Sequence, residues 1–365
     1  MSISEFPEKP AFEGGFAQII GHVRALKTLQ SMLQKDEIPH ALLFSGEEGI
    51  GKRTVALTFA QALLCQERQQ SEGEAGEGET EGSIEPCGHC LSCRKLTDRN
   101  HPDLLTIEPE GSAIKVEQIR ALQDRIVFKP VEGSRRIVLI DPADEMNIAA
   151  ANAFLKTLEE PPSQTILILI TSKPFSLPET IRSRCQKVSF HSLSLSQVEN
   201  LLAERKGWST HDARLVASLT GGNLGKALSL DIEAARAEET GLHTLVSEKT
   251  LTDYEALFEA ATSSSRDEET MAKSLHYLSA WFRDVLVLLA VPDPDRLDPS
   301  WLVYHWRHEE IKQWARRMDT NNVGKFLADI QEIERAQIRN INRQLALETL
   351  LMQLRDKLIH QERMA

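Results

Sequence analysis

A glycine-rich segment at residues 46–52 constrains the fold of this chain more than any other feature. It reads Gly-Glu-Glu-Gly-Ile-Gly-Lys, which is the Gly-x-x-x-x-Gly-Lys pattern of a phosphate-binding P-loop. An apolar run at 41–44 precedes it, and a predicted helix from about Gly51 to Cys65 follows it. Strand, loop and helix in this order are the context that a P-loop requires. The segment therefore predicts an α/β domain of nucleotide-binding ancestry.

The position after the P-loop lysine departs from the pattern. Ser or Thr is expected there because its hydroxyl ligates Mg²⁺, whereas this chain has Arg53, with Thr54 one place late. A guanidinium is positively charged and has no acceptor, so Arg53 cannot replace a metal ligand, but it can pair with a phosphate or with a carboxylate. Two interpretations stay open: a loop that still holds ATP or ADP, or a turn that no longer binds anything. The candidate nucleotide contacts in this segment are Gly46, Gly49, Gly51, Lys52, Arg53 and Thr54.

A second departure lies at the end of the apolar run 137–140. Asp141 follows this predicted strand, at the position of the acid that supports the metal in P-loop ATPases. The next residue is usually Glu, which polarises the attacking water, but this chain has Pro142. The offsets of Asp144 and Glu145 place them on the following turn or helix. Asp141 is either an acid of the nucleotide site or only a strand-terminal acid that caps the next helix.

Strands and helices alternate through the first half of the chain. Apolar runs predict strands near 104–107, 137–140 and 165–170, and helical periodicity predicts helices near 22–34, 116–128 and 148–158. This alternation favours a mainly parallel sheet covered by helices on both faces. We expect this first domain to span residues 1–192.

The pattern changes after about residue 192, where helical periodicity dominates. Short helices are predicted near 195–205, 211–219 and 224–230, and long ones near 271–289, 323–335 and 342–360. We interpret residues 193–245 as a small helical domain and residues 246–365 as an all-helical C-terminal domain.

Four of the five cysteines have the spacing of a metal site. Cys87, Cys90 and Cys93 form Cys-x₂-Cys-x₂-Cys, and Cys65 lies upstream. Four thiolates suit tetrahedral Zn²⁺, and because they leave no open position, such a zinc would be structural. The alternatives are reduced cysteines without a ligand, or a disulfide. Cys185 is distant in sequence and is expected to be a packed thiol.

Charge and composition narrow the class of protein. The net charge is −12, and the tract 66–86, with seven Glu and one Arg, supplies half of it. Its composition predicts a solvated, disordered insert. An acidic chain is a poor nucleic-acid binder on its own, since phosphate contacts need basic surfaces. No run is apolar and long enough to span a membrane, and the N-terminus lacks the features of a signal peptide, so we expect a cytoplasmic protein.

Two arginines follow the last predicted strand of the first domain. Arg182 and Arg184 lie on a predicted short helix after Pro178. Such a pair is usually a solvated helix face. Its place, one helix beyond the core strands, supports a second interpretation, because an arginine at the edge of a P-loop domain can reach a neighbour's nucleotide as a trans-acting finger.

Several segments together resemble the clamp-loader subunits of bacterial DNA polymerase III, a branch of the AAA+ superfamily. The resemblance rests on residues 39–44, on the four-cysteine module, on His101-Pro102-Asp103, on residues 153–162 (Ala-Phe-Leu-Lys-Thr-Leu-Glu-Glu-Pro-Pro) and on Ser183-Arg184-Cys185. It covers about residues 15–230, whereas the C-terminal third matches only in its helical character.

The resemblance implies a helical lid after the nucleotide-binding domain and a C-terminal collar that holds five subunits in a ring. Such a ring opens a sliding clamp and loads it on primed DNA, and its other members would be gamma/tau and delta subunits. By position, Thr171 would be the sensor at the end of the fourth core strand, and Arg184 the arginine finger for a neighbouring motor subunit. In active motors the lid reads Gly-x-Leu-Arg-Asp-Ala-Leu, whereas residues 222–228 of this chain have Gly225 in place of that arginine.

All three departures affect the chain's own nucleotide site, while the arginine that would serve a neighbour is retained. We therefore expect a clamp-loader component of the DNA polymerase III holoenzyme without independent catalysis. One rival is an active gamma/tau-like ATPase. A second is a zinc-containing nucleic-acid binding module, which the excess of acidic residues disfavours.

Overall fold

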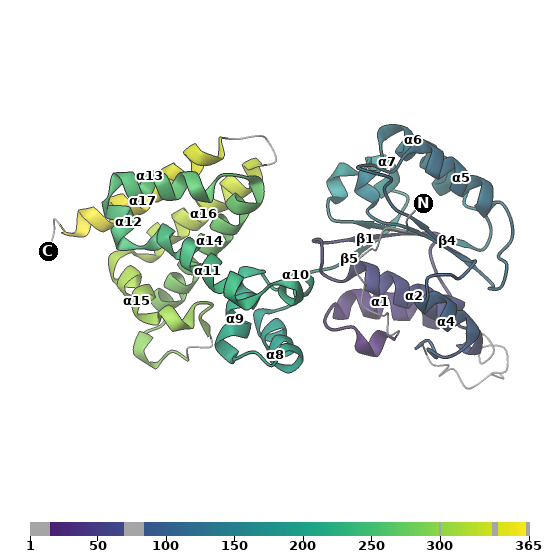
Figure 1. Ribbon diagram of the computed structural model, residues 1–365, viewed down its shortest axis with the longest axis horizontal. Coiled ribbons are helices and arrows are strands. Elements are labelled where there is room, and N and C mark those ends of the chain that lie inside the picture. Colours follow the sequence, from purple (N-terminus) through teal and green to yellow (C-terminus); the bar gives the residue numbers. More distant parts are fainter. Residues whose placement is uncertain (1–14, 69–83, 299–300, 338–341, 363–365) are drawn as a thin grey trace. The chain divides into compact units, whose positions relative to one another are not determined.

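The chain forms two compact units, residues Met1–Leu193 and Ser194–Ala365, in a computed structural model (Figure 1). The structure describes residues 15–68, 84–298, 301–337 and 342–362. In these ranges, no helix is long and apolar enough to cross a membrane. The predicted class, a parallel α/β unit followed by helical structure, is confirmed. The three-domain division, with boundaries at 192/193 and 245/246, stays a prediction.

The first unit is built on a five-stranded, fully parallel sheet in the order β2-β3-β4-β1-β5. The strands are β1 Ala41–Ser45, β2 Leu104–Ile107, β3 Arg136–Ile140, β4 Thr165–Thr171 and β5 Gln186–Ser189. Four of them match predicted strands. The edge strand β5 was not predicted, because it is only four residues long and Val188 is its one buried residue.

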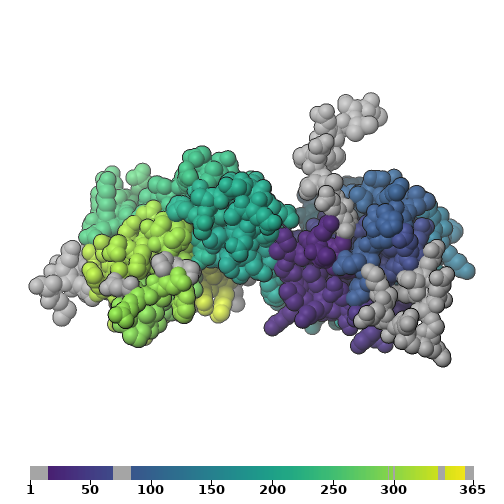
Figure 2. All heavy atoms as spheres, turned by 90° about the horizontal axis from the view of Figure 1, so that it is seen from below, coloured from purple at the N-terminus to yellow at the C-terminus, as the bar shows by residue number. Residues whose placement is uncertain are grey.

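Helices cover both faces of this sheet (Figure 1). One layer contains α1 Val23–Lys35, α2 Lys52–Leu64 and α4 Leu91–Thr97, and the other contains α5 Val116–Ile126, α6 Ile148–Glu159 and α7 Glu179–Arg182. The 3₁₀ turns are η1 Phe16–Gln18, η2 Ala143–Glu145 and η3 Pro174–Ser176. In Figure 2, which views the molecule from below, the segment around α1 forms the purple part of the surface of this unit.

The three central strands β1, β3 and β4 are buried on both sides, which is why the sequence shows continuous apolar runs there rather than alternation. Along β1, Leu42 and Phe44 join the core under the α1–α2 layer, whereas Ala41 and Leu43 join the core under the α5–α6 layer. Successive side chains of a strand point to opposite faces, so each of the three central strands contributes to both cores. The two cores fix the sheet from both sides and hold its carboxyl ends in register.

The described part of the second unit is helical. Its helices are α8 Leu195–Lys206, α9 Thr210–Leu219, α10 Leu224–Ser229, α11 Ile232–His243, α12 Glu248–Thr252, α13 Tyr254–Ser264, α14 Glu268–Ala290, α15 His308–Arg317, α16 Thr320–Gln337 and α17 Arg343–Glu362, with 3₁₀ turns η4 Thr244–Val246, η5 Pro294–Arg296 and η7 His305–Arg307. The buried side chains Tyr277, Trp281 and Phe282 of α14 lie in a single core that extends to α17.

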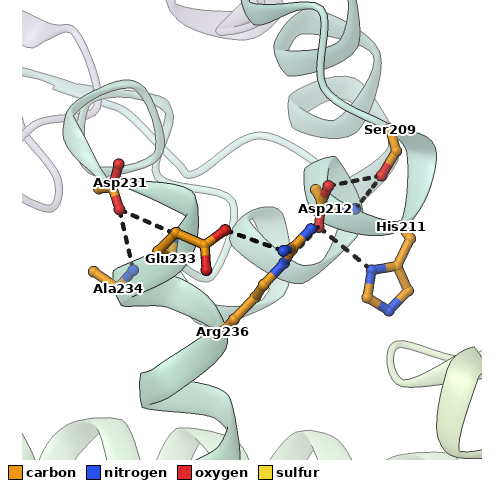
Figure 3. Close-up of polar contacts among 7 residues, drawn as sticks. All are labelled: Ser209, His211, Asp212, Asp231, Glu233, Ala234 and Arg236. Atoms are coloured by element: carbon orange, nitrogen blue, oxygen red, sulfur yellow. Dashed lines mark hydrogen bonds and ion pairs between the residues drawn. The ribbon is translucent and has the colours of Figure 1, made fainter.

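A polar cluster joins the first turns of α9 and α11 (Figure 3). The carboxylate of Asp212 accepts hydrogen bonds from Ser209 Oγ at 2.9 Å and from Arg236 Nη2 at 2.9 Å. Asp231 caps α11 by accepting from the backbone N–H groups of Glu233 and Ala234. Side-chain caps of this kind satisfy N–H groups that a helix leaves unpaired, so the cluster has a structural role.

Candidate functional site

A cavity of about 710 Å³ lies where the P-loop meets the carboxyl ends of the sheet strands. Ligands of open parallel sheets bind in this position. The cavity brings together seven residues that the sequence singled out, which are Gly49, Gly51, Lys52, Arg53, Thr54, Asp141 and Thr171. It also contains charged residues that were not assigned to the site, namely Glu48, Glu108, Asp144, Glu145 and Lys173. Gly46 is not among its lining residues.

Gly46 has a packing role instead. A Cβ atom at this position would lie 2.6 Å from the carbonyl oxygen of Phe190 and 2.7 Å from Cδ1 of Ile50. Its backbone N–H donates to the Thr171 carbonyl at 3.3 Å, which joins the loop to the end of β4. Only glycine allows this close backbone approach, so Gly46 sets the path by which the loop leaves β1.

The side chain of Lys52 is turned into its own loop. Its Nζ donates to the carbonyl oxygens of Gly46 at 2.7 Å and Glu47 at 2.5 Å, and only 6% of the residue is exposed. Burial lowers the pKa of Lys52, although Asp141 and Glu48 act in the opposite direction. An incoming phosphate would therefore replace two carbonyl acceptors of an ammonium group that is already held at the start of α2.

Arg53 pairs with carboxylates, which is one of the two pairings that the sequence allowed. Its Nη1 donates to Asp141 Oδ2 at 3.0 Å, and its Nη2 bonds to Glu108 at the end of β2. Burial raises the pKa of Asp141, and the adjacent Arg53 charge partly offsets that effect. The carboxylate of Asp141 thus bonds to Arg53, while η2 has no side-chain cap. Asp141 is an acid of the pocket rather than a helix cap.

These residues do not fit a Mg²⁺ ion of the usual P-loop kind. Such a site needs a hydroxyl after the lysine and a free carboxylate at the strand end. Here a guanidinium stands at the first position and bonds to the second. Thr54 lines the cavity, but it is the next residue along the helix, about 100° further round the helix axis.

Thr171 is the last residue of β4 and is fully buried. Its Oγ1 donates to Asp144 Oδ1 at 2.6 Å and accepts from the backbone N–H of Lys173 at 3.0 Å. Asp144 and Glu145 lie on η2, on the turn that their offsets predicted, and both line the cavity. The hydroxyl of Thr171 is thus fixed by two hydrogen bonds at the carboxyl end of β4, and its role as a sensor stays a prediction.

The four predicted cysteines converge beside the C-terminal end of α2. Their sulfur atoms all lie within 4.8 Å of one another. Cys65 is the C-cap of α2, and Cys90 is the N-cap of α4. Backbone N–H groups donate to three of the sulfurs: that of Cys87 to Cys65 at 3.4 Å, that of Cys90 to Cys87 at 3.3 Å and that of Cys93 to Cys90 at 3.4 Å.

This cluster fits a structural metal ion. Hydrogen bonding from Cys93 lowers the pKa of Cys65, which favours its thiolate form. A tetrahedral cation would stabilise all four thiolates together. His89 is exposed and bonds to the Cys87 carbonyl and to Glu67, so its ring does not belong to the four-sulfur group. Burial raises the pKa of Cys185 to about 12, in agreement with a packed thiol.

A buried polar chain connects the cysteine module to the sheet. Ser92 on α4 donates to the Leu64 carbonyl at 2.6 Å and bonds to His101 Nε2 at 3.0 Å. Asp103 accepts from the backbone N–H groups of residues 131, 132 and 133 at 2.7–2.9 Å and faces Arg136 at 3.5 Å. This arrangement explains the His-Pro-Asp motif, which anchors the start of β2 to both the cysteine module and the loop before β3.

Asp103→Asn is expected to destabilise the first unit by about 1.5–3 kcal/mol, because a buried Arg136 loses its counter-charge. Burial opposes ionisation of Asp103, but the three N–H donors and Arg136 outweigh it and lower its pKa from 3.8. The contribution of the ionised Asp103 to the free energy of unfolding is therefore fully present above pH 3.8. It is lost as the pH falls through the lower pKa of Asp103 in the folded state. Urea unfolding measured against pH tests this.

The exposed Asp98→Asn is the matched control for that experiment, since it removes a carboxylate nearby without removing a buried partner. It is expected to leave the free energy of unfolding unchanged within about 0.5 kcal/mol. If Asp103→Asn and the unsubstituted chain have the same free energy of unfolding, the charge of Asp103 does not stabilise the first unit.

Arg184 lies just beyond α7, at the edge of the first unit. Its Nη1 donates to the Thr180 carbonyl at 3.0 Å, its Nη2 pairs with Glu159 at 2.8 Å, and 37% of its side chain is exposed. Arg182, two residues earlier, instead lies over the Phe175 ring at 5.2 Å. Of the two arginines, Arg184 is the more exposed, since Arg182 is half-buried.

Gly225 lies in the first turn of α10 and is exposed, as is Lys226 beside it. The position that the resemblance equates with an arginine of active motors thus carries no side chain, and the assignment of this region as a lid stays a prediction. Most of the predicted insert 66–86 falls outside the described residues, which exclude 69–83.

Comparison with known proteins adds independent evidence. A family model for the DNA polymerase III delta subunit matches residues 21–194. The delta′ subunit from Bacillus subtilis (strain 168) is 31% identical over 337 residues, which is 91% of this chain and 96% of that protein. The delta′ subunit from Pseudomonas aeruginosa is 43% identical over 148 residues, or 40% of this chain and 41% of that protein. The Bacillus subtilis tau subunit is 33% identical over 220 residues, or 59% of this chain but only 37% of tau.

Proposed function

Because this chain belongs to the family of DNA polymerase III delta′ subunits, we propose that it is a clamp-loader subunit that does not hydrolyse ATP itself. The observation that carries this proposal is the Arg53–Asp141 ion pair, which occupies the carboxylate that a catalytic metal would need. Pro142 stands where a glutamate would activate water. The pocket therefore lacks both a free carboxylate for the catalytic metal and a glutamate directly after it to activate water.

Arg184 is the residue through which the subunit acts on catalysis. A guanidinium that reaches a neighbour's ATP stabilises the charge that develops on the transferred phosphoryl group. The exposure of Arg184 and its position at the edge of the unit support this role. The subunit thus completes the ATP site of an adjacent motor while its own pocket stays inactive.

The partners follow from the same role. They are the gamma/tau and delta subunits in a five-membered ring, and through that ring the sliding clamp and primed DNA. The helical second unit would supply the collar contacts between subunits. Zn²⁺ bound by Cys65, Cys87, Cys90 and Cys93 would hold the C-terminal end of α2 to α4 and would take no part in hydrolysis.

An active gamma/tau-like ATPase is the second candidate, because the chain is 33% identical to a tau subunit over 220 residues. Glu145 lines the pocket and could in principle polarise a water. It lies on η2 rather than directly after Asp141, however, and the ion pair of Arg53 still obstructs the metal. The chemistry of the pocket therefore favours the subunit without hydrolysis.

The purified chain is expected to show no ATP turnover above that of its Lys52→Ala variant, with or without primed DNA. Added to motor and delta subunits, the same preparation should be required for clamp loading. Phosphate release and a clamp-loading assay measure these two properties. DNA-stimulated turnover by the isolated chain that disappears in Lys52→Ala would establish the motor function instead.

A further inference from the structure

A second group of metal-binding side chains lies at the exposed edge of the four-cysteine cluster. Glu67, Cys87 and His89 offer an oxygen, a sulfur and a nitrogen atom that all lie within 4.8 Å of one another. Zn²⁺ binds each of these three ligand types in proteins. Cys87 also belongs to the four-sulfur group, so the two groups share one ligand.

The contacts of His89 determine which of its ring nitrogens is available. Nδ1 lies 2.7 Å from the carbonyl oxygen of Cys87, which can only accept, so Nδ1 carries a proton. Nε2 lies 2.9 Å from Oε1 of Glu67. In a neutral ring this nitrogen has a lone pair, and two acceptors at such a distance repel one another unless a positive charge lies between them. A metal-binding histidine usually donates from one nitrogen to a carbonyl or carboxylate and faces the cation with the other.

The two groups differ in their access to solvent. The side chains of His89 and Glu67 are 68% and 49% exposed. Cys65 and Cys93 are buried, whereas Cys87 is only partly buried. A hydrated zinc ion therefore reaches the four-sulfur group from the side that carries Cys87, and it meets the carboxylate and the imidazole there first.

We propose that Glu67, His89 and Cys87 form a loading site, at which zinc binds before it moves to the four cysteines. The carboxylate attracts the hydrated cation, and three protein ligands leave the fourth tetrahedral position to water. A second thiol takes that position as its thiolate and releases its proton to solvent. Glu67 and His89 are then displaced in turn, while Cys87 holds the ion throughout.

The signature of a loading site is kinetic. An ion that enters and leaves by the same route crosses the same barrier in both directions, so the loss of a loading ligand slows uptake and release by the same factor. The dissociation constant is the ratio of the two rate constants and stays unchanged. A residue that only stabilises the loaded cluster would instead speed release and weaken the affinity for zinc.

The test uses the full chain and zinc alone, at a temperature below the melting temperature of the chelator-treated chain. Release is followed as transfer of zinc from the loaded chain to an excess of a colorimetric chelator, and uptake as transfer from a zinc–indicator complex to the metal-free chain. Glu67→Gln and His89→Ala are each expected to slow both processes by about tenfold, the effect of losing one contact with a charged partner from the transition state. Both variants should still bind about one zinc per chain with the affinity of the unsubstituted chain.

Three further variants complete the design. Glu67→Asp keeps a carboxylate and should recover a part of both rates. Glu37→Gln and His40→Ala are the matched controls, because they remove an exposed carboxylate and an exposed imidazole from the same unit, outside both metal-binding groups. Both controls should take up and release zinc as fast as the unsubstituted chain.

Two results would overturn the loading site while zinc still binds. One is unchanged rates in Glu67→Gln and His89→Ala, and the other is faster release with weaker affinity. The inference rests on the zinc proposed for the four cysteines, so a chain that takes up no zinc overturns both. The proposed role in clamp loading is judged separately, by turnover and clamp loading.

Discussion

Arg184→Ala is expected to slow hydrolysis at the neighbouring ATP site of the assembled loader by about 10³-fold or more, without disrupting the ring. The reason is that a finger acts in the transition state, when charge accumulates on the transferred phosphoryl group. Removing it leaves ATP binding nearly unchanged and weakens only the stabilisation of that charge. Single-turnover hydrolysis in the reconstituted loader measures the effect, because the slowed site appears as a separate slow phase.

The contacts of Arg184 make this prediction specific. Its partner Glu159 is 52% exposed, and an exposed ion pair contributes only about 0.2–1 kcal/mol. The side chain can therefore leave Glu159 and Thr180 at little cost when a nucleotide of a neighbour is in reach. For the same reason, Arg184→Ala should not unfold the subunit, and gel filtration should recover the intact ring.

Three variants serve as comparisons. Lys187→Ala removes an exposed positive charge from the neighbouring strand β5 and should not alter turnover. Glu159→Gln frees Arg184 from its ion pair and should leave the fast phase intact. Arg184→Lys keeps the charge but loses the planar fork, so it should recover only a part of the rate. Unchanged hydrolysis in Arg184→Ala would refute the finger assignment.

Removing the zinc that we propose for the four-cysteine cluster is expected to destabilise the first unit by about 4 kcal/mol, the linkage expected when free zinc is 1,000-fold above its dissociation constant. For a unit of this size the loss corresponds to a decrease in Tm of roughly 8–16 °C. Metal analysis should find about one zinc per chain. Thermal unfolding with and without a chelator measures the decrease.

The fifth cysteine provides the matched control for this experiment. Cys93→Ser and Cys90→Ser should lose the metal and unfold at the temperature of the chelated protein. Cys185→Ser should keep its zinc, because Cys185 lies outside the four-sulfur group. His89→Ala should also keep it, since the ring bonds to Glu67 and the Cys87 carbonyl. A metal-free chain with an unchanged Tm in chelator would show that the cluster is not a zinc site.

The sequence predicted the elements that carry long or strongly patterned signals. The strand 104–107 and the helices around the P-loop agree with the structure to within about two residues. The short elements β5 and α4 were not predicted, because four or seven residues give too little periodicity to distinguish from a loop. The helices α11, α13 and α15 were not predicted as separate elements either. The grouping of the four cysteines is confirmed, and it was predictable because three of them lie within seven residues and only Cys65 must be brought from elsewhere. The zinc itself stays a prediction.

The environment of the pocket was only partly predictable. The sequence placed Asp141 and Thr171 at strand ends, and the structure brings both to the same cavity. It gave no indication of Glu108, which follows an ordinary strand, or of the bond between Asp144 and Thr171. These contacts join residues from different strands and turns, and strand order is set by packing of the whole sheet rather than by local pattern.

The sequence by itself determined that this chain has a P-loop without the usual hydroxyl, a strand-end acid followed by proline, four metal-type cysteines and an arginine beyond the core strands. These features are residue identities and spacings, so they can be read from the sequence without knowledge of the fold. Only the tertiary structure decided what Arg53 does. Its pairing with two carboxylates depends on β2 and β3 lying side by side, because that pairing brings Glu108 and Asp141 to the same guanidinium.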